Sequence, residues 1–182
     1  MNLNLSMIKF LGIATIASVA IPFAAIAADT SEPPKKTKTT TECTNGQVWD
    51  EATNECVDPQ DSHLIDDALF RAARELAYDQ QYDNALKVLA AMGDQSDPRV
   101  LNYKGFVLRK TGQFEQGLAY YQKALTVDPD YHLARSYMGQ GYAEDGQLVL
   151  AYAQLVEIRN RGGKGTWAYR ELEKSLFEGS TY

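Results

Sequence analysis

The stretch "LNYKGFVLRKTGQFEQGLAYYQKALTVDP", residues 101–129, carries the pattern that decides the fold. In its first half, Leu101, Gly105 and Leu108 recur three or four positions apart, which places them on one side of a helix. Gly112 follows a threonine and interrupts this pattern. The second half repeats the helical spacing of small and apolar residues up to a closing proline. The sequence therefore predicts two helices joined by a short turn.

The same layout occurs once on either side of this stretch. "RSYMGQGYAEDGQLVLAYAQLVEI" (135–158) repeats it thirty-four residues later, and "ALFRAARELAYDQQYDNALKVLAAM" (68–92) is a looser, earlier copy. Small side chains allow two paired helices to approach closely. In each copy, a small residue of the first helix precedes one of the second by twelve positions: Ala73 and Ala85, Gly105 and Gly117, Gly139 and Ala151. We expect repeats at about residues 66–97, 98–131 and 132–165.

A further helix follows the third copy. "GTWAYRELEKSLFEG" (165–179) has an apolar side that includes Trp167 and Leu172, and Thr166 is suited to cap its N-terminus. Because each helix pair leaves an apolar face open until a neighbour stacks on it, the last pair needs a cap. The sequence predicts that the helix over 166–178 supplies this cap.

These copies resemble tetratricopeptide repeats, whose pattern of aromatic, glycine, tyrosine, alanine and proline residues spans about thirty-four positions. The middle copy is the most complete, with Gly105, Gly112, Phe114, Tyr121, Ala124 and Pro129 in place. The resemblance implies an all-α fold over residues 61–179, a solenoid of three helix-turn-helix repeats and a C-terminal capping helix.

In this family the first helices of the repeats line a concave surface that commonly holds a peptide. The register places seven residues on that surface as candidate partner-binding positions: Phe70, Arg74, Asn102, Phe106, Arg109, Ser136 and Gln140. The amide suits a peptide backbone, the arginines suit carboxylates and the phenylalanines suit an apolar anchor. Packing is the alternative for Phe70 and Phe106, because a short array can fold its cap or linker into its own groove. The family's carboxylate-clamp residues do not appear.

The only two cysteines lie in "ECTNGQVWDEATNEC", residues 42–56. Turn-forming residues separate them, and residues 1–28 resemble a secretory signal, which would deliver the chain to an oxidising compartment. We therefore predict a Cys43–Cys56 disulfide that closes a small motif over residues 43–60. Residues 47–49 alternate as a short strand does, and "EATN" reads as a turn behind it.

Residues 43–58 also resemble the second half of small chitin-binding modules of the peritrophin type, which carry more disulfides than this chain can make. The resemblance implies a disulfide-closed hairpin with an exposed Trp49, a possible stacking platform for a cell-wall glycan. The alternative is that Trp49 packs over the disulfide or against the first helix.

Residues 1–28 have the features of a secretory signal peptide: Lys9, an apolar run and the small-residue end Ala25-Ile26-Ala27. The alternative is an uncleaved membrane anchor, since the apolar run is just long enough to span a bilayer. We expect cleavage, no stable membrane insertion of the mature chain, and a periplasmic or secreted protein. Residues 29–42 have no aliphatic side chain and read as a disordered linker.

The net charge and the residue patterns disfavour several classes of function. A net charge of −6 disfavours nucleic-acid binding, which needs a basic face. No residue pattern supports a catalytic site, a metal site or a cofactor, because the two histidines lie far apart and "RNRGGKGTW" (159–167) lacks the residues of a phosphate loop. We expect a non-enzymatic interaction module that binds an envelope protein or peptide in its groove. Glycan binding through the cysteine loop is the alternative, and exposed end faces could also make the protein a homo-oligomer.

Overall fold

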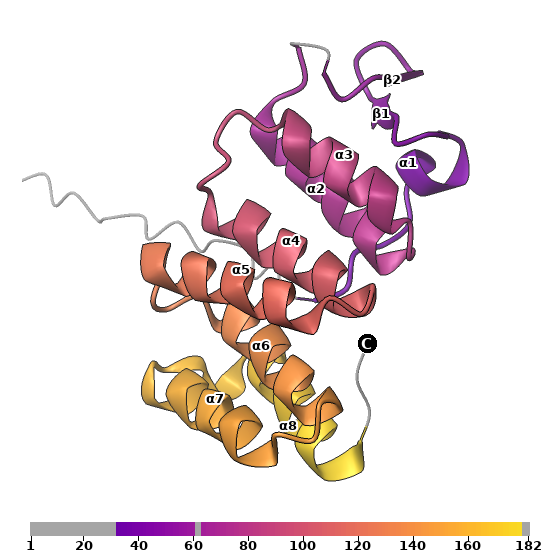
Figure 1. Cartoon of the computed structure of the whole chain (residues 1–182). Helices are drawn as coiled ribbons and strands as arrows, with labels where there is room; N and C mark the ends of the chain where they lie inside the picture. The colour runs from indigo at the N-terminus through magenta and orange to yellow at the C-terminus, as the bar shows by residue number, and fades with distance from the viewer. Residues whose placement is uncertain (1–31, 61–62, 180–182) are drawn as a thin grey trace, which may run out of the picture.

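The computed structural model describes residues 32–60 and 63–179, so the predicted signal peptide over 1–28 lies outside the described residues. Helices pack in adjacent pairs from one end of the molecule to the other (Figure 1). The pairs are α2 and α3 (Asp66–Tyr78, Tyr82–Ala91), α4 and α5 (Pro98–Lys110, Phe114–Val127), and α6 and α7 (His132–Glu144, Leu148–Asn160). A 3-10 turn at Gly163–Gly165 leads to α8 (Trp167–Glu178). The predicted all-α fold of three repeats and a cap is confirmed.

Close contact between glycines holds the central pair together. A Cβ atom at Gly105 would lie 2.9 Å from the carbonyl oxygen of Gly117, and one at Gly117 would lie 2.8 Å from that of Gly105. Real Cβ atoms do not approach other heavy atoms so closely, so α4 and α5 reach this distance only with glycine on both sides. The twelve-residue interval in the sequence thus marks the crossing point of the two helices.

The capping helix begins as the sequence predicts. The Thr166 hydroxyl accepts a hydrogen bond from the amide of Tyr169 at 3.3 Å. Leu172 of α8 then fills the space beside Gly139 of α6, where a Cβ would lie 2.7 Å from its methyl groups. The packing of α8 against α6 covers the inner side of the last repeat.

A two-stranded antiparallel hairpin precedes the helices, with β1 at Val48–Asp50 and β2 at Glu55–Val57. The predicted Cys43–Cys56 disulfide closes it, with the two Cα atoms 5.5 Å apart. Val48 is buried in the same cluster as the core of the first repeat. The Lys87 ammonium of α3 contacts the Asp58 carboxylate at 2.9 Å. The hairpin therefore packs on the N-terminal end of the array.

The segment before the hairpin differs from the expected disordered linker over residues 29–42. Lys38–Thr41 form a short helix, α1, capped by the hydroxyl of Thr37. Composition suggested disorder because the segment has nothing apolar to bury, but it is held by polar contacts instead. Its anchor is the buried carboxylate of Glu75 in α2, thirty-eight positions after Thr37. A partner so far away in the sequence leaves no local signal.

No helix within residues 32–60 and 63–179 is long and apolar enough to cross a membrane. In the same part of the chain, no group of three or more histidine, cysteine or acidic residues is placed to hold a metal ion.

Candidate interaction surfaces

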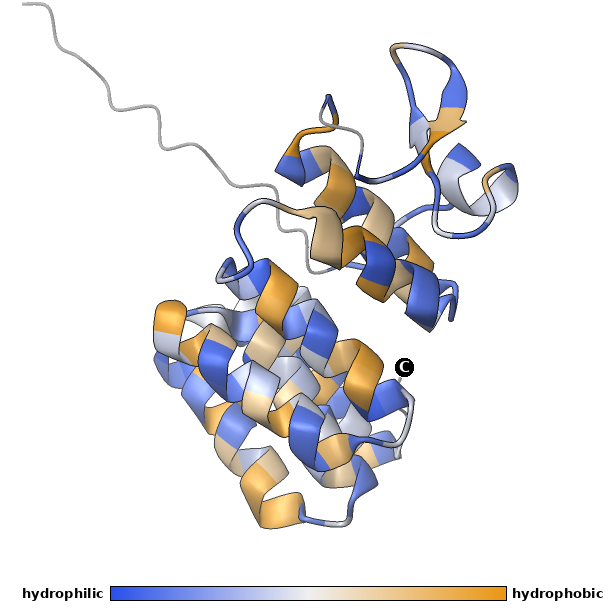
Figure 2. Cartoon of the chain, turned by 45° about the horizontal axis from the view of Figure 1, so that its top comes forward, coloured by the Kyte–Doolittle hydropathy of each residue, from blue (hydrophilic) through white to orange (hydrophobic). Residues whose placement is uncertain are grey.

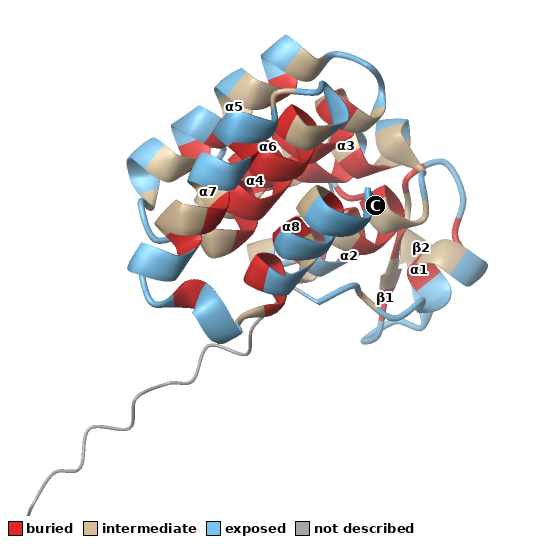
Figure 3. Cartoon of the chain, turned by 90° about the horizontal axis from the view of Figure 1, so that it is seen from below, coloured by how far each residue is buried: buried red, intermediate tan, exposed pale blue. Residues whose placement is uncertain are grey.

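The residues predicted to line a peptide groove lie on α2, α4 and α6, the first helices of the three repeats, as the register requires. Their exposure differs from the expectation: Arg74 is partly exposed, and the other six are buried, namely Phe70, Asn102, Phe106, Arg109, Ser136 and Gln140. Figure 3 shows α4 and α6 coloured as buried along most of their length. In this arrangement these six side chains face the interior of the protein.

Aromatic side chains fill the space that a groove would occupy. The ring of Phe106 lies 5.0 Å from that of Tyr137 and 5.7 Å from that of Tyr78. Phe70 meets Tyr103 edge to face at 5.5 Å. The hydroxyls of Tyr78 and Tyr137 are 2.6 Å apart, so α2 and α6 touch across the helix that separates them in the repeat order. Burial raises the pKa of Tyr137 well above its usual value, so this hydroxyl stays protonated.

The polar candidates are also paired within the protein. Asn102 donates from its amide nitrogen to the hydroxyl of Tyr131, and Gln140 donates to the hydroxyl of Ser136 at 3.2 Å. Arg74 donates to the hydroxyl of Tyr103 at 3.1 Å. The bond of Arg74 joins α2 to α4 and that of Asn102 joins α4 to the residue before α6, whereas Gln140 and Ser136 both belong to α6 and pair within that helix.

Arg109 is a buried cation. Its guanidinium donates to the Glu144 carboxylate at 2.6 Å and lies 5.6 Å from the ring centre of Phe106. The arginine side chain is 1% exposed, whereas that of Glu144 is 33% exposed. Since a buried charge without its partner is strongly unfavourable, this pair fixes α4 against α6.

An acidic edge of α2, formed by Glu75 and Asp79, lies beside the filled interior and is a candidate binding surface. Glu75, at 5% exposure, accepts hydrogen bonds from the Thr37 amide at 2.6 Å, the Thr37 hydroxyl at 2.7 Å and the Thr40 hydroxyl. Asp79, at the end of α2, forms an ion pair with Lys36. The carboxylates of α2 thus hold a polypeptide segment by its backbone, its hydroxyls and an ammonium group.

The segment that occupies this edge is part of the same chain. From residue 32 it runs beside α8 and α2 to α1, on the side of the molecule away from α5 and α7 (Figure 3). Glu32 lies 4.0 Å from the guanidinium of Arg170 in α8, and Lys36 and Thr37 reach α2. Residues 32–37 thus bridge the last and the first helix of the array. The sequence analysis missed Glu75 and Asp79, and the only hint was the lysine-rich composition of residues 35–38 against these acids.

The hairpin and α2 enclose a second candidate site, a cavity of about 320 Å³. Trp49, Asp50 and Glu51 line it from the hairpin, and Arg71 and Glu75 line it from α2. Asp50 is buried, and hydrogen bonds from the amide of Ala52 and the hydroxyl of Thr53 hold its pKa below the usual range. The cavity therefore combines an aromatic ring with charged groups of both signs.

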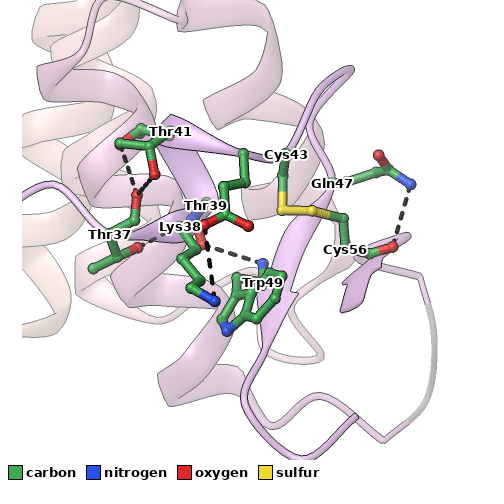
Figure 4. The surroundings of a disulfide bond; sticks show 10 residues. Thr37, Lys38, Thr39, Thr41, Cys43, Gln47, Trp49 and Cys56 are labelled. Atoms are coloured by element: carbon green, nitrogen blue, oxygen red, sulfur yellow. Dashed lines mark hydrogen bonds and ion pairs between the residues drawn. A yellow bond between two sulfur atoms is a disulfide. The ribbon is translucent and has the colours of Figure 1, made fainter. Parts of the chain in front are cut away.

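Trp49 itself is partly buried, so the exposed stacking platform expected from the sequence is reduced. The ammonium of Lys38 lies 4.0 Å from the centre of the Trp49 ring. Figure 4 shows the two side chains next to each other. The backbone amide of Trp49 donates to the hydroxyl of Thr39 at 3.2 Å. The indole nitrogen is buried and has no hydrogen-bond partner among the residues that the structure describes. One ring face is thus occupied by a cation of the same chain.

Comparison with known proteins agrees with this architecture. The model of the tetratricopeptide repeat family matches residues 98–131, which are helices α4 and α5 and the turns that follow them. No curated protein and no solved structure matched the chain. Repeats of this family typically serve as protein–protein interaction modules and not as enzymes. The matched segment, residues 98–131, is thus a tetratricopeptide repeat, and a helix pair in the same register flanks it on either side.

Proposed function

We propose that the protein is a non-enzymatic adaptor of the periplasm or another extracytoplasmic compartment, and that it binds an extended segment of a partner protein along the acidic edge of α2. One observation carries this proposal: Glu75 and Asp79 already hold a polypeptide segment, residues 36–40 of the same chain. A partner segment with similar hydroxyl and ammonium groups would bind there in place of the chain's own.

The compartment is supported by two independent features. The first is the signal-like sequence over residues 1–28. The second is the Cys43–Cys56 disulfide, because such bonds persist in oxidising compartments and are rare in the cytosol. A disulfide-closed hairpin on the first repeat suits a protein that works outside the reducing cytosol.

We propose this edge as the contact surface in preference to the groove expected from the sequence, because most of the groove candidates are buried. The seven groove candidates are mostly buried, so a peptide that touched them would first have to separate α2 from α6. Phe106→Ala is expected to cost about 3–5 kcal/mol of stability, as large core truncations do. A partner lost with that variant would therefore report unfolding and not a lost contact.

The test is a crosslinking pull-down from a cell-envelope fraction with three variants of the purified protein. Lys36→Ala/Thr37→Ala removes the chain's own contacts with α2 and should increase partner capture. Glu75→Gln/Asp79→Asn removes the acceptor charges and should decrease it. Asp83→Asn, an exposed carboxylate on α3, is the matched control and should have no effect. Equal capture by all four proteins would refute binding at this edge.

A second function, glycan binding, is favoured by the cavity beside Trp49, because its ring and its polar lining suit a hydroxyl-rich ligand. The measurement is sedimentation with insoluble peptidoglycan or chitin, with Trp49→Ala as the variant. Retention on neither polymer, or equal retention of both proteins, argues against this function. Retention that depends on Trp49 while the α2 variants behave as wild type would favour it over the adaptor.

A further inference from the structure

The outer face of α7 is apolar and exposed. Val149 is 83% exposed, Leu148 55% and Tyr152 51%, and Phe177 of α8 beside them is 73% exposed. Figure 2 shows the hydrophobic start of α7 in orange at the lower edge of the molecule. A helix that is apolar on both its inner and outer sides is normally covered on both. Here the inner side packs on α6 and α8, and no part of residues 32–60 and 63–179 covers the outer side.

The corresponding helices of the other repeats are built differently. Val149 lies two positions before the small residue of α7. The residues two positions before the small residues of α5 and α3 are Glu115 and Asp83. Both carboxylates are exposed. An exposed valine thus occupies a position where the other two repeats have a charge, so the third repeat has an apolar surface that the repeat fold itself does not require.

The apolar surface continues into a shallow cavity of about 100 Å³ between α7 and α8. Tyr152 and Val156 line it from α7, and Tyr169 and Phe177 line it from α8. Bulky side chains project here from α8, whereas α4 pairs closely with α5 through glycines. A further repeat helix could not approach α8 as closely as α5 approaches α4. The surface therefore suits a broader apolar partner.

We propose that this face, composed of Leu148, Val149, Tyr152, Val156 and Phe177, binds the same face of a second copy of the chain around a two-fold axis. The inference concerns self-association and is independent of partner binding at α2. The exposed parts of the four most exposed side chains add up to an apolar surface on the order of 500 Å², if a fully exposed large side chain contributes about 150–250 Å². A standard interface buries about 800 Å² per partner, and about 65% of a homodimer interface is apolar, which is again about 500 Å².

The charged residues at the cavity are self-complementary. Arg159 lines it from α7 and Glu173 lines it from α8. A two-fold axis through the face brings both residues of one copy toward both residues of the other, so each charge can meet its opposite. This complementarity commits the face to a second copy, since a partner with a single charge sign would leave one of the two unpaired.

The net charge of the chain determines how dimerisation should depend on salt concentration. Each copy carries a formal charge of −6, so two copies repel each other at low ionic strength. Salt screens this repulsion and leaves the apolar contact intact. The dimer should therefore become tighter between low and moderate salt, whereas binding dominated by ion pairs would weaken.

The experiment is sedimentation equilibrium of the purified protein over a concentration series at two salt concentrations. We expect a monomer–dimer equilibrium in the micromolar range that tightens with salt. Val149→Glu, which restores the charge found in α5, should weaken it about tenfold or more, equivalent to about 1.4 kcal/mol. Tyr152→Gln should weaken it as well. Val127→Glu, at an exposed valine on α5, is the matched control and should not change it.

Circular dichroism and thermal melting establish that the variants keep their fold, which the exposed positions of Val149 and Tyr152 make the expected result. A wild-type protein that stays monomeric at the highest soluble concentration would overturn the inference. So would a dimer that Val149→Glu and Val127→Glu affect equally, because association would then use another surface.

Discussion

Replacement of Gly105 by alanine tests the claim that close glycine contact builds the central repeat. The added methyl group would lie 2.8 Å from a ring carbon of Tyr121 and 2.9 Å from the carbonyl oxygen of Gly117. Ordinary contacts between such atoms are about 3.5–4.0 Å. The ring could turn, but the carbonyl belongs to the backbone of α5, so α4 and α5 must move apart.

Two effects of opposite sign determine how much Gly105→Ala changes the free energy of unfolding. Alanine is favoured over glycine in a helix interior by about 0.8–1.0 kcal/mol. Forcing an extra carbon into a packed core costs about 1–3 kcal/mol. The contact with backbone places Gly105→Ala at the upper end of that range, so we expect a net loss of about 2 kcal/mol. For a helical array of this size, the melting temperature should fall by roughly 8 °C.

Urea unfolding followed by far-UV circular dichroism measures the change, and Gly165→Ala provides the control. Among the residues that the structure describes, no atom lies within 4 Å of a Cβ at Gly165, and the φ angle of Gly165 is not in the left-handed region. Alanine there should stabilise the protein by about 0.4–1 kcal/mol, because it restricts the unfolded chain. The two substitutions are chemically identical and are expected to have opposite signs. A Gly105→Ala protein as stable as wild type would refute the close crossing of α4 and α5.

Two further predictions concern the hairpin. Cys43→Ser/Cys56→Ser should cost roughly 3 kcal/mol of hairpin stability for a closed loop of this length, and hydrogen exchange should show lost protection in β1 and β2 while α4 to α6 keep theirs. Because hydrogen bonds from the amide of Ala52 and the hydroxyl of Thr53 lower the pKa of Asp50, this carboxylate stabilises the hairpin above its unfolded pKa of about 3.9. That stability should disappear as the pH falls through the lower folded pKa, and Asp50→Asn should remove this part of the acid transition in a titration of the Trp49 indole signal followed by NMR.

The fold was predictable because its determinants are local and periodic. The positions of Gly105, Gly117 and Gly139 repeat along the chain, and each glycine lies where a neighbouring helix or side chain leaves no room for a Cβ. Thr166 and the cysteine pair carry equally local signals, and both predictions are confirmed.

The surfaces were less predictable because they depend on contacts between distant residues. The register places Phe106 on the inner side of the array, but it does not reveal that Tyr78 and Tyr137 meet across it. Similarly, the composition of the segment before the hairpin does not reveal the buried carboxylate of Glu75 that holds Thr37 and Thr40. Whether a face is a groove or an interior is decided by side chains from all three repeats together.

The two ends of the array are closed by different means, and this asymmetry suggests how the protein assembles. At the first repeat, the hairpin covers α2 and α3 with a disulfide-closed unit tied to α3 through the Lys87–Asp58 ion pair. At the last repeat, α8 covers the inner side of α6 but leaves Val149 and Tyr152 on α7 exposed. A stacked array needs a polar surface at each terminus to remain a single copy. Within the described residues, the last terminus exposes these apolar side chains, so we expect self-association at α7 and α8. The acidic edge of α2 lies outside that contact, and a partner would bind there in place of residues 36–40.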